Sequence, residues 1–310
     1  MVRHRLRGSD FLSLKPFDGG EIEDLIEESM RLKNEGTKGY RPLSGKAIGL
    51  LFEKPSTRTR VSFEVAVLRL GGYPITLGGG EMQLGRGETI EDTGRVLSRY
   101  LDGLVVRTFG HDRLEALASA SQIPVINALT DTCHPCQALA DMLTILEYKG
   151  SLKGIKLAYV GDGNNVANSL MRAGTKLGME MTVATPKGHE PGRDIVDECM
   201  EYCGTYGSSL ELTDSAQGAV RGADVIYTDV WVSMGTDSDE AEISEDFKGF
   251  QVDQELVSLA HEDAMVLHCL PAHRGVEITD EVLDGSHSAV WDQAENRLHV
   301  QISLLGMIFG

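Results

Sequence analysis

The segment KAIGLLFEKPSTRTR occupies residues 46–60 and joins an apolar run to a group of hydroxyl and guanidinium side chains. The apolar run, residues 46–52, is typical of a buried strand, and Pro55 prevents the strand from continuing. Ser56 is a residue type that caps helix starts, so we expect a helix over residues 57–70, where a Gly-Gly pair ends it. The segment therefore predicts a strand, a turn and a helix in immediate succession.

The turn of this unit has the composition of an anion-binding site. Backbone N–H groups at a helix start lack intrahelical partners and favour negative charge. Ser56, Thr57, Arg58 and Thr59 add hydroxyl groups and a guanidinium to that turn, and Arg60 follows them. The pattern indicates a phosphate-binding site; the alternative is an ordinary capped helix that carries surface arginines.

Strand-like and helix-like runs alternate along almost the whole chain, which predicts an α/β fold with parallel sheets covered by helices on both faces. The predicted strands are residues 46–52, 73–77, 103–109, 123–129, 155–161, 180–185, 208–213, 224–229 and 264–269. The predicted helices of the first half are residues 21–34, 56–70, 88–101, 111–121 and 134–148, and the tail, 292–309, forms a final helix. We expect two doubly wound domains, residues 1–149 and 150–291, joined by a hinge at Gly150–Gly154.

The composition excludes several classes of partner. The 310-residue chain has a net charge of -18, from 47 acidic and 29 basic residues, which argues against nucleic acid and anionic membranes. No apolar run approaches the roughly 20 residues that span a bilayer, and no apolar stretch follows the N-terminal arginines as in a signal peptide. The cysteine number is odd, with no disulfide-like spacing, so we expect a protein of the reducing cytoplasm.

Three further segments place polar residues where a strand ends or a helix begins. His134-Pro135-Cys136-Gln137 opens a predicted helix, and His134 and Gln137 share one helix face because they are three residues apart. The segments 229–235 (DVWVSMG) and 268–271 (HCLP) each follow an apolar strand, and Pro271 favours extended backbone before it. Open α/β sheets bind their ligands at such strand ends.

Together these four motifs resemble the transcarbamoylase family, in the expected order from near Phe11 to the C-terminus, and Ser233-Met234-Gly235 resembles its ornithine-specific loop. The resemblance implies transfer of a carbamoyl group from carbamoyl phosphate to the δ-amine of L-ornithine, giving L-citrulline and phosphate. It implies an interdomain active site, a C-terminal helix, residues 292–310, that returns to the first domain, and a homotrimer or a multiple of trimers. We expect no cofactor and no metal.

The resemblance also implies roles for individual residues. The residues implied in carbamoyl phosphate binding are Ser56, Thr57, Arg58, Thr59, Gln83, Arg107, His134, Gln137, Cys269, Leu270 and Arg297. Within this set, His134 donates to the carbonyl oxygen, Gln137 binds the carbamoyl amide, and backbone carbonyls near Cys269 and Leu270 hold the carbamoyl NH2. Gln83 reaches the site of a neighbouring subunit.

The ornithine side is implied to contain Asn165, Asp229, Ser233 and Met234, with Cys269 beside the ornithine side chain. Asp229 either pairs with the α-ammonium or guides the δ-amine. The catalytic residues implied are Arg58, Arg107, His134, Asp229 and Cys269, whereas Arg60 has a structural role.

Several alternatives compete with this interpretation. Cys133 and Cys136 form a C-x-x-C pair, but no second pair of zinc-ligand spacing follows. Residues 161–166 (GDGNNV) lack the third glycine of a dinucleotide-binding fingerprint, which disfavours NAD. A nucleophilic Cys269 is disfavoured because the neighbouring His268 should point to the opposite strand face. The remaining alternatives are a carbamoyltransferase for another amine, aspartate or putrescine, and a metabolite-binding relative without catalysis.

Overall fold

The computed structural model describes residues 2–78, 87–231 and 245–310. The chain divides into two compact units, one formed by Met1–Ala140 with Arg297–Gly310 and the other by Asp141–Asn296. Both boundaries fall inside helices, so the last helix of the chain belongs partly to the first unit.

The first unit contains a four-stranded parallel sheet in the order β2-β1-β3-β4. Its strands are β1 (Ala47–Phe52), β2 (Tyr73–Gly78), β3 (Gly103–Arg107) and β4 (Val125–Leu129). Its helices are α1 (Val2–Leu6), α2 (Gly19–Glu35), α3 (Thr57–Arg69), α4 (Ile90–Leu97) and α5 (His111–Ala120), with the start of α6 (Pro135–Lys149) and the end of α13 (Val290–Phe309). The strand–turn–helix unit predicted at residues 46–70 is therefore present.

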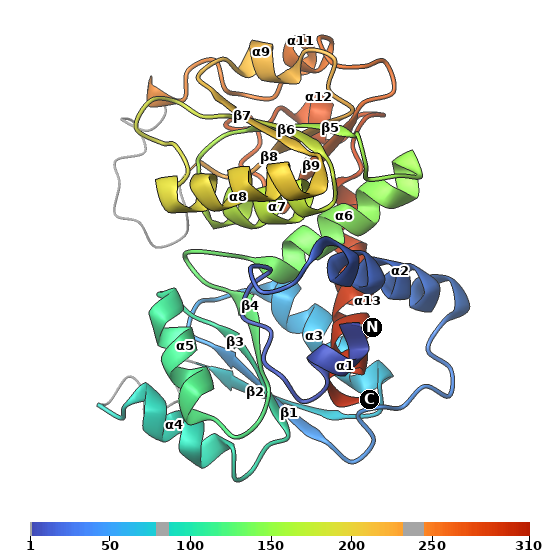
Figure 1. The fold of residues 1–310 in the computed structure, drawn as a ribbon, viewed down its shortest axis with the longest axis vertical. Helices are drawn as coiled ribbons and strands as arrows, with labels where there is room; N and C mark the ends of the chain where they lie inside the picture. The colour runs from blue at the N-terminus through green and yellow to red at the C-terminus, as the bar shows by residue number, and fades with distance from the viewer. Residues whose placement is uncertain (1, 79–86, 232–244) are drawn as a thin grey trace. The chain divides into compact units, whose positions relative to one another are not determined.

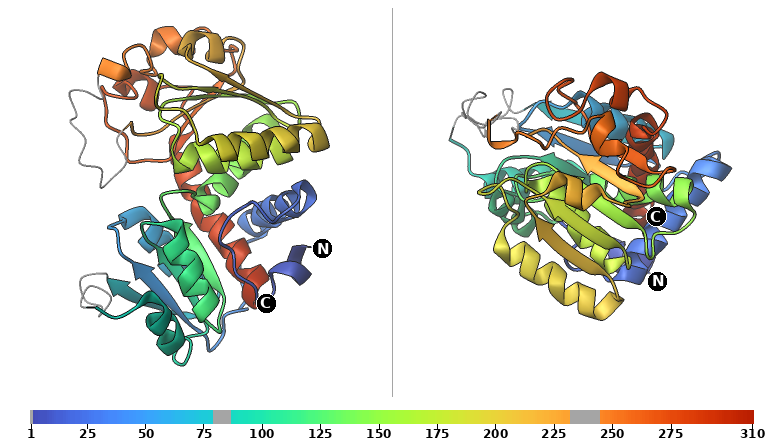
Figure 2. Two further views of the ribbon diagram at one scale, coloured as in Figure 1. Left: turned by 60° about the vertical axis from the view of Figure 1, so that its left-hand side comes forward. Right: turned by 90° about the horizontal axis from the view of Figure 1, so that it is seen from above.

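Helices cover both faces of this sheet. On one face, α4 and α5 pack over a core that includes Leu51, Leu104 and Leu117 (Figure 1). On the other face, Gly103 leaves room for the ring of Phe309, since a Cβ on Gly103 would lie 2.3 Å from Phe309 Cζ. The C-terminal end of α13 lies near the N-terminus in Figures 1 and 2, where Gly8 N–H donates to the Ile308 carbonyl at 2.9 Å. The return of the last helix to the first domain is thus confirmed.

The second unit contains a five-stranded parallel sheet in the order β7-β6-β5-β8-β9. Its strands are β5 (Lys156–Val160), β6 (Glu180–Ala184), β7 (Ser209–Thr213), β8 (Val225–Thr228) and β9 (Met265–His268). Its helices include α7 (Asn165–Lys176), α8 (Arg193–Tyr206), α9 (Ala216–Val220), α11 (Gln254–Val257) and α12 (Asp280–Leu283). Figure 1 shows α7 and α8 on one face of this sheet and α9 and α11 on the other, over a core that includes Val160, Phe247 and Val266.

Both sheets are doubly wound, as predicted, and each has a point where the strand order reverses. In the first sheet this point lies between β1 and β3, and in the second between β5 and β8. Loops that leave neighbouring strands in opposite directions open a crevice at the carboxyl ends of those strands. The two reversal points place residues 53–56 and 107–110 together in the first unit, and residues 161–164 and 229–231 together in the second.

Close backbone packing explains the glycine pattern of residues 161–166. Gly163 N–H donates to the His189 carbonyl at 2.8 Å, and a Cβ on Gly163 would lie 2.3 Å from Pro191 N and 2.5 Å from Glu190 C. The glycine is therefore required by a neighbouring backbone segment of the same unit, without any nucleotide.

We expect Gly163→Ala to lower the free energy of unfolding by about 2 kcal/mol, because backbone atoms cannot move aside as a flexible side chain would. Gly204→Ala is the matched control: Gly204 lies in α8 with nothing within 4 Å of a Cβ, so alanine should stabilise by about 0.5–1 kcal/mol. Urea unfolding of the two variants and the parent measures both effects. Equal stability of Gly163→Ala and the parent would contradict the packing argument.

Candidate functional site

The start of α3 is built as the sequence predicted. Ser56 has extended backbone and caps the helix, its Oγ accepting from Thr59 N–H at 3.3 Å. Thr57 and Arg58 are exposed on the first turn, whereas Thr59 is fully buried. The helix start thus offers backbone N–H groups, hydroxyls and one exposed guanidinium next to the carboxyl end of β1.

Arg297 joins this turn from the far end of the sequence. Its Nη2 donates to Thr59 Oγ1 at 2.7 Å, although 238 positions separate the two residues. Both residues belong to the first unit and are buried, so α13 places a guanidinium at the start of α3.

Arg107 and His134 complete a buried group that we call the arginine–histidine cluster: Thr59, Arg107, His134 and Arg297. Arg107 is the last residue of β3 and pairs in register with Phe52, just before the α3 turn. Burial, followed by the positive charges of Arg297 and Arg107, holds the pKa of His134 well below its usual 6.5. His134 is therefore a neutral imidazole that can donate one hydrogen bond.

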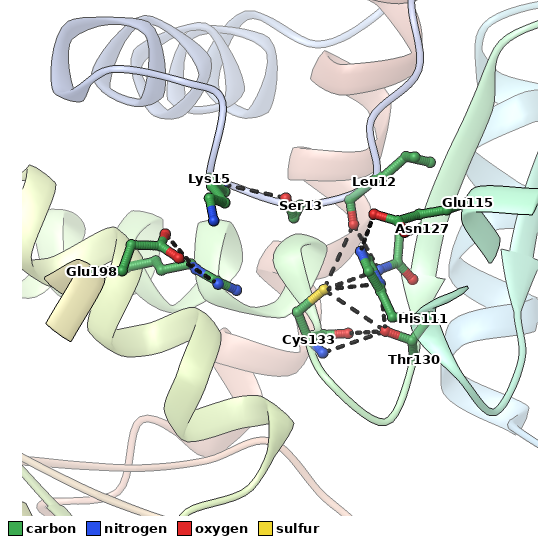
Figure 3. Close-up of polar contacts among 10 residues, drawn as sticks. Leu12, Ser13, Lys15, His111, Glu115, Asn127, Thr130, Cys133 and Glu198 are labelled. Atoms are coloured by element: carbon green, nitrogen blue, oxygen red, sulfur yellow. Dashed lines mark hydrogen bonds and ion pairs between the residues drawn. The ribbon is translucent and has the colours of Figure 1, made fainter. Parts of the chain in front are cut away.

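The loop before His134 is fixed by a second set of contacts, shown in Figure 3. Cys133 Sγ lies 3.3 Å from Asn127 Nδ2 and 3.7 Å from His111 Nδ1, and His111 Nδ1 lies 3.1 Å from Thr130 Oγ1. Pro135 begins α6, and Gln137, predicted to share the face of His134, is buried in its first turn. These contacts tie the loops that carry Arg107 and His134 to each other.

Cys136 differs from a metal-binding thiolate. Its Sγ donates to the Asn127 carbonyl at 3.4 Å, and burial raises the pKa of the thiol to about 12. The thiol is protonated at neutral pH and acts as a buried packing group.

In the second unit, Asp229 follows β8 and Cys269 follows β9. Cys269 Sγ donates to Asp229 Oδ1 at 2.9 Å, and Asn164 Nδ2 donates to Asp229 Oδ2 at 3.0 Å. Asn164 also caps α7, its Oδ1 accepting from the N–H groups of Val166 and Ala167. The contact to Asp229 comes from Asn164, which was not among the predicted site residues; Asn165, predicted to bind ornithine, is half-buried at the first position of α7.

The backbone at Leu270 differs from the prediction. We expected extended backbone before Pro271, but Leu270 has a φ of 58°, in the left-handed region. Such a conformation costs about 1–2 kcal/mol for a residue with a side chain. The physical reason for the difference is a local hydrogen bond, since Leu270 N–H turns back to His268 Nδ1 at 2.9 Å.

Asp229, His268 and Cys269 bring potential metal-ligand atoms within 4.8 Å of one another. Both ring nitrogens of His268 are in use, because Nδ1 accepts from Leu270 and Nε2 lies 3.0 Å from Glu277 Oε1. A metal on this imidazole would have to displace one of these two bonds. The same contacts disfavour activation of the Cys269 thiol by His268. The imidazole is hydrogen-bonded to Leu270 and Glu277, whereas the thiol donates to Asp229.

Three of the predicted site residues lie outside the described residues: Gln83, Ser233 and Met234. Arg60 is exposed, with its Nε 3.9 Å from Glu64 Oε1. Two further contacts of the first unit were not predicted: Arg113 holds Glu53 through Nε and Nη2, at 3.1 and 2.8 Å, and Lys54 Nζ lies 2.6 Å from Asp131 Oδ1.

Two domain models of one protein family match most of the chain. Residues 9–147 match the family model described as aspartate/ornithine carbamoyltransferase, carbamoyl-P binding domain, and residues 153–308 match the Asp/Orn binding domain of the same family. The chain belongs to the aspartate/ornithine carbamoyltransferase family. Membership of this carbamoyltransferase family confirms the resemblance drawn from the four motifs.

Individual relatives are similar over their full length. The ornithine carbamoyltransferase of Anoxybacillus flavithermus is 52% identical over 303 residues, which are 97% of this chain and 96% of the relative. That of Thermococcus kodakarensis is 51% identical and covers 98% of both chains. The solved structure of ornithine carbamoyltransferase from Pyrococcus furiosus is 50% identical, with a TM-score of 0.95 over 98% of both chains.

The neutral state of His134 in this carbamoyltransferase predicts a dependence of stability on pH. The unfolded chain binds a proton on this residue below about pH 6.5, whereas the folded chain does not. The contribution of His134 to the free energy of unfolding is therefore fully present above that pH. This contribution is lost as the pH falls toward the lower pKa of the folded state, by at most about 1.4 kcal/mol per pH unit.

His134→Gln should reduce the slope of unfolding free energy against pH between about pH 5 and 6.5, because it removes the group that titrates differently in the two states. Urea unfolding of both chains across this range measures the slopes. Identical slopes would show that folded His134 takes up a proton like an exposed histidine.

Proposed function

We propose that this chain transfers the carbamoyl group of carbamoyl phosphate to the δ-amine of L-ornithine, with L-citrulline and phosphate as products. The observation that carries the proposal is the arginine–histidine cluster, which brings buried guanidinium groups and a neutral imidazole to the α3 start within a carbamoyl-phosphate-binding domain. Phosphate and a polarised carbonyl are the groups that such a cluster binds best.

The chemistry requires charge stabilisation and needs no covalent nucleophile. When the amine attacks the carbonyl carbon, negative charge develops on the carbonyl oxygen and then on the departing phosphate. Ser56, Thr57, Arg58 and Thr59 at the α3 start, with Arg107, supply donors and fixed positive charge to the phosphate oxygens. Burial of Thr59 and Arg107 lowers the dielectric around these two residues and strengthens their interactions with the phosphate.

The neutral His134 suits a donor role at the carbonyl oxygen. A neutral imidazole donates a hydrogen bond and retains its proton more strongly than an imidazolium, so it polarises the carbonyl without protonating it. Gln137, one helical turn away, is proposed to bind the carbamoyl amide. Burial, and then the positive charge of the nearby Arg297, lower the pKa of this imidazole and keep it neutral, and Arg297 adds positive charge to the phosphate side.

For the second substrate, Asp229 is proposed to bind an amino group of ornithine. Its carboxylate already accepts from Cys269 and Asn164, which fixes the orientation of both oxygens. The proposed partners on the amino-acid end are Asn165, Ser233 and Met234, and the backbone carbonyls of Cys269 and Leu270 are proposed to hold the carbamoyl NH2. The names of the full-length relatives support ornithine over aspartate, and the Pyrococcus furiosus relative is named anabolic, which supports synthesis of citrulline.

We also propose a trimer, or a multiple of trimers, in which Gln83 serves a neighbouring subunit. The support is an apolar surface on the first unit: Leu68 of α3 is 58% exposed, and Tyr73 and Ile75 lie exposed on β2, an edge strand. An exposed apolar edge of this kind favours association with another chain. This strand ends at Gly78, directly before the segment that contains Gln83.

A cytoplasmic location remains part of the proposal, supported by five cysteines that are all free thiols. Among the described residues, no helix is long and apolar enough to cross a lipid bilayer.

The proposed reaction is tested by measuring carbamoyl products from purified protein and carbamoyl phosphate, with ornithine, aspartate and putrescine in parallel. We expect citrulline from ornithine and no product from the other two amines. Product from another amine alone would overturn the ornithine assignment, and no product from any amine would favour a metabolite-binding protein.

The same assay with two neighbouring arginines tests the phosphate assignment. Arg58→Gln should lower kcat/KM for carbamoyl phosphate about 10- to 100-fold, since one charge-assisted contact is lost. Arg60→Gln should change it less than about threefold, because among the described residues the ion pair of Arg60 is an exposed one with Glu64. Equal losses in both variants would refute the assignment.

The proposed trimer predicts a solution mass of about 101 kDa, three times 33.7 kDa, or a multiple of it, by light scattering. Leu68→Glu should reduce this mass and the activity together, because a charge would be buried at the interface. Met200→Glu, at a residue 45% exposed on α8 of the other unit, is the control and should change neither. A parent chain that is monomeric and active would disprove the trimer.

A further inference from the structure

Leu270 holds a backbone conformation that its own side chain disfavours. Among the residues that the structure describes, Leu270 is the non-glycine residue with a positive φ. It lies next to Cys269, which donates to Asp229, so its conformation sets the direction of the carbonyls that follow β9. Something in the surrounding structure must hold this turn.

The group that holds it is the imidazole of His268. Leu270 N–H donates to His268 Nδ1 at 2.9 Å, so that nitrogen carries a lone pair and the ring proton lies on Nε2. Nε2–H then donates to Glu277 Oε1 at 3.0 Å. The ring is therefore a neutral, single tautomer that links a carboxylate to a backbone N–H.

The position of Glu277 is fixed by burial and by hydrogen bonds. It is fully buried, and its Oε1 also accepts from His273 N–H at 2.5 Å. A buried carboxylate is costly unless hydrogen bonds satisfy it, and here two donors converge on one oxygen. His273 Nδ1, on a half-exposed ring, lies 3.9 Å from the other oxygen.

The backbone of His268 is fixed from the opposite side. His268 N–H donates to Gln293 Oε1 at 2.9 Å, and Gln293 Nε2 donates to Asp141 Oδ1 at 2.7 Å and lies 3.2 Å from the Tyr227 hydroxyl. All these residues belong to the second unit. Hydrogen bonds thus hold both the backbone and the imidazole ring of His268 at the end of β9.

We infer that His268 and Glu277 are positioning residues for the carbamoyl-binding backbone of Cys269 and Leu270. This inference rests on the proposed function, in which those carbonyls hold the carbamoyl NH2. Glu277 selects the Nε2–H tautomer, and that tautomer leaves Nδ1 as the acceptor that holds Leu270 in the left-handed region. Without the carboxylate, the proton can move to Nδ1, where it would face the Leu270 N–H and release the turn.

Two substitutions of His268 separate its hydrogen bond with Leu270 from its hydrogen bond with Glu277. His268→Asn keeps an acceptor near the position of Nδ1 for Leu270 but leaves Glu277 without its donor. His268→Gln keeps a donor near the position of Nε2 for Glu277 but leaves Leu270 without its acceptor. We expect His268→Gln to lower kcat about 100-fold with little change in KM for ornithine, and His268→Asn to lose less than about 10-fold.

Glu277 provides an independent pair of variants. Glu277→Gln keeps an acceptor for Nε2–H and should retain most of the activity, whereas Glu277→Ala should lose kcat as His268→Gln does. Nitrogen chemical shifts of the His268 ring should report the Nε2–H tautomer in the parent and in Glu277→Gln, and a mixture of tautomers in Glu277→Ala. Thermal unfolding of every variant separates misfolding from misplacement.

The outcomes distinguish the inference from the proposed function. If the parent forms citrulline but kcat follows thermal stability alone, or the two His268 variants lose equal activity, the positioning role is wrong and the proposed function stands. If the parent makes no carbamoyl product, the proposed function fails and the catalytic part of the inference fails with it. A parent ring protonated at Nδ1 would overturn the inference whatever the activity.

Discussion

Parallel pairing of buried strands brings the carboxyl ends of β1 and β3 together in one unit and of β5 and β8 in the other. At these ends the backbone leaves the sheet, so its N–H and C=O groups no longer form hydrogen bonds with neighbouring strands. The side chains at or just after these strand ends, such as Arg107 and Asp229, therefore lie at the carboxyl end of each sheet. The proposed chemistry of both units depends on this arrangement, because helices cover both faces of each sheet and leave the carboxyl ends of the strands for a ligand.

The protein buries positive charge although its net charge is negative. The protein carries a net charge of -18, yet Arg107 and Arg297 are buried beside a histidine that they help to keep neutral. A dense positive centre inside an acidic envelope attracts an anion only at close range, since solvent and salt screen the outer charges. The protein thereby combines a net negative charge with a buried positive centre, to which we propose that phosphate binds.

Local patterns in the sequence were sufficient for much of the fold and part of the candidate site. Strand ends and helix caps are determined by nearby residues, so the positions of Ser56, His134 and Asp229 followed from apolar runs and capping chemistry. Contacts between distant segments had no such signal. The hydrogen bond from Asn164 to Asp229, and the burial of Glu277 between apolar neighbours, depend on packing that no local pattern encodes. Leu270 departed from the rule for residues before proline because a side-chain acceptor competes with local preference.

The hydrogen bond from Arg297 to Thr59 has a consequence for the synthesis of the protein. A chain emerges from the ribosome N-terminus first, and its domains fold as they appear. The first unit, however, includes Arg297–Gly310, which are translated after the whole of the second unit. Its early segments must wait, with Thr59 lacking its Arg297 partner, until the second unit has been translated. A chain that stopped before Arg297 would therefore keep an uncovered sheet face in its first unit and would never assemble the arginine–histidine cluster.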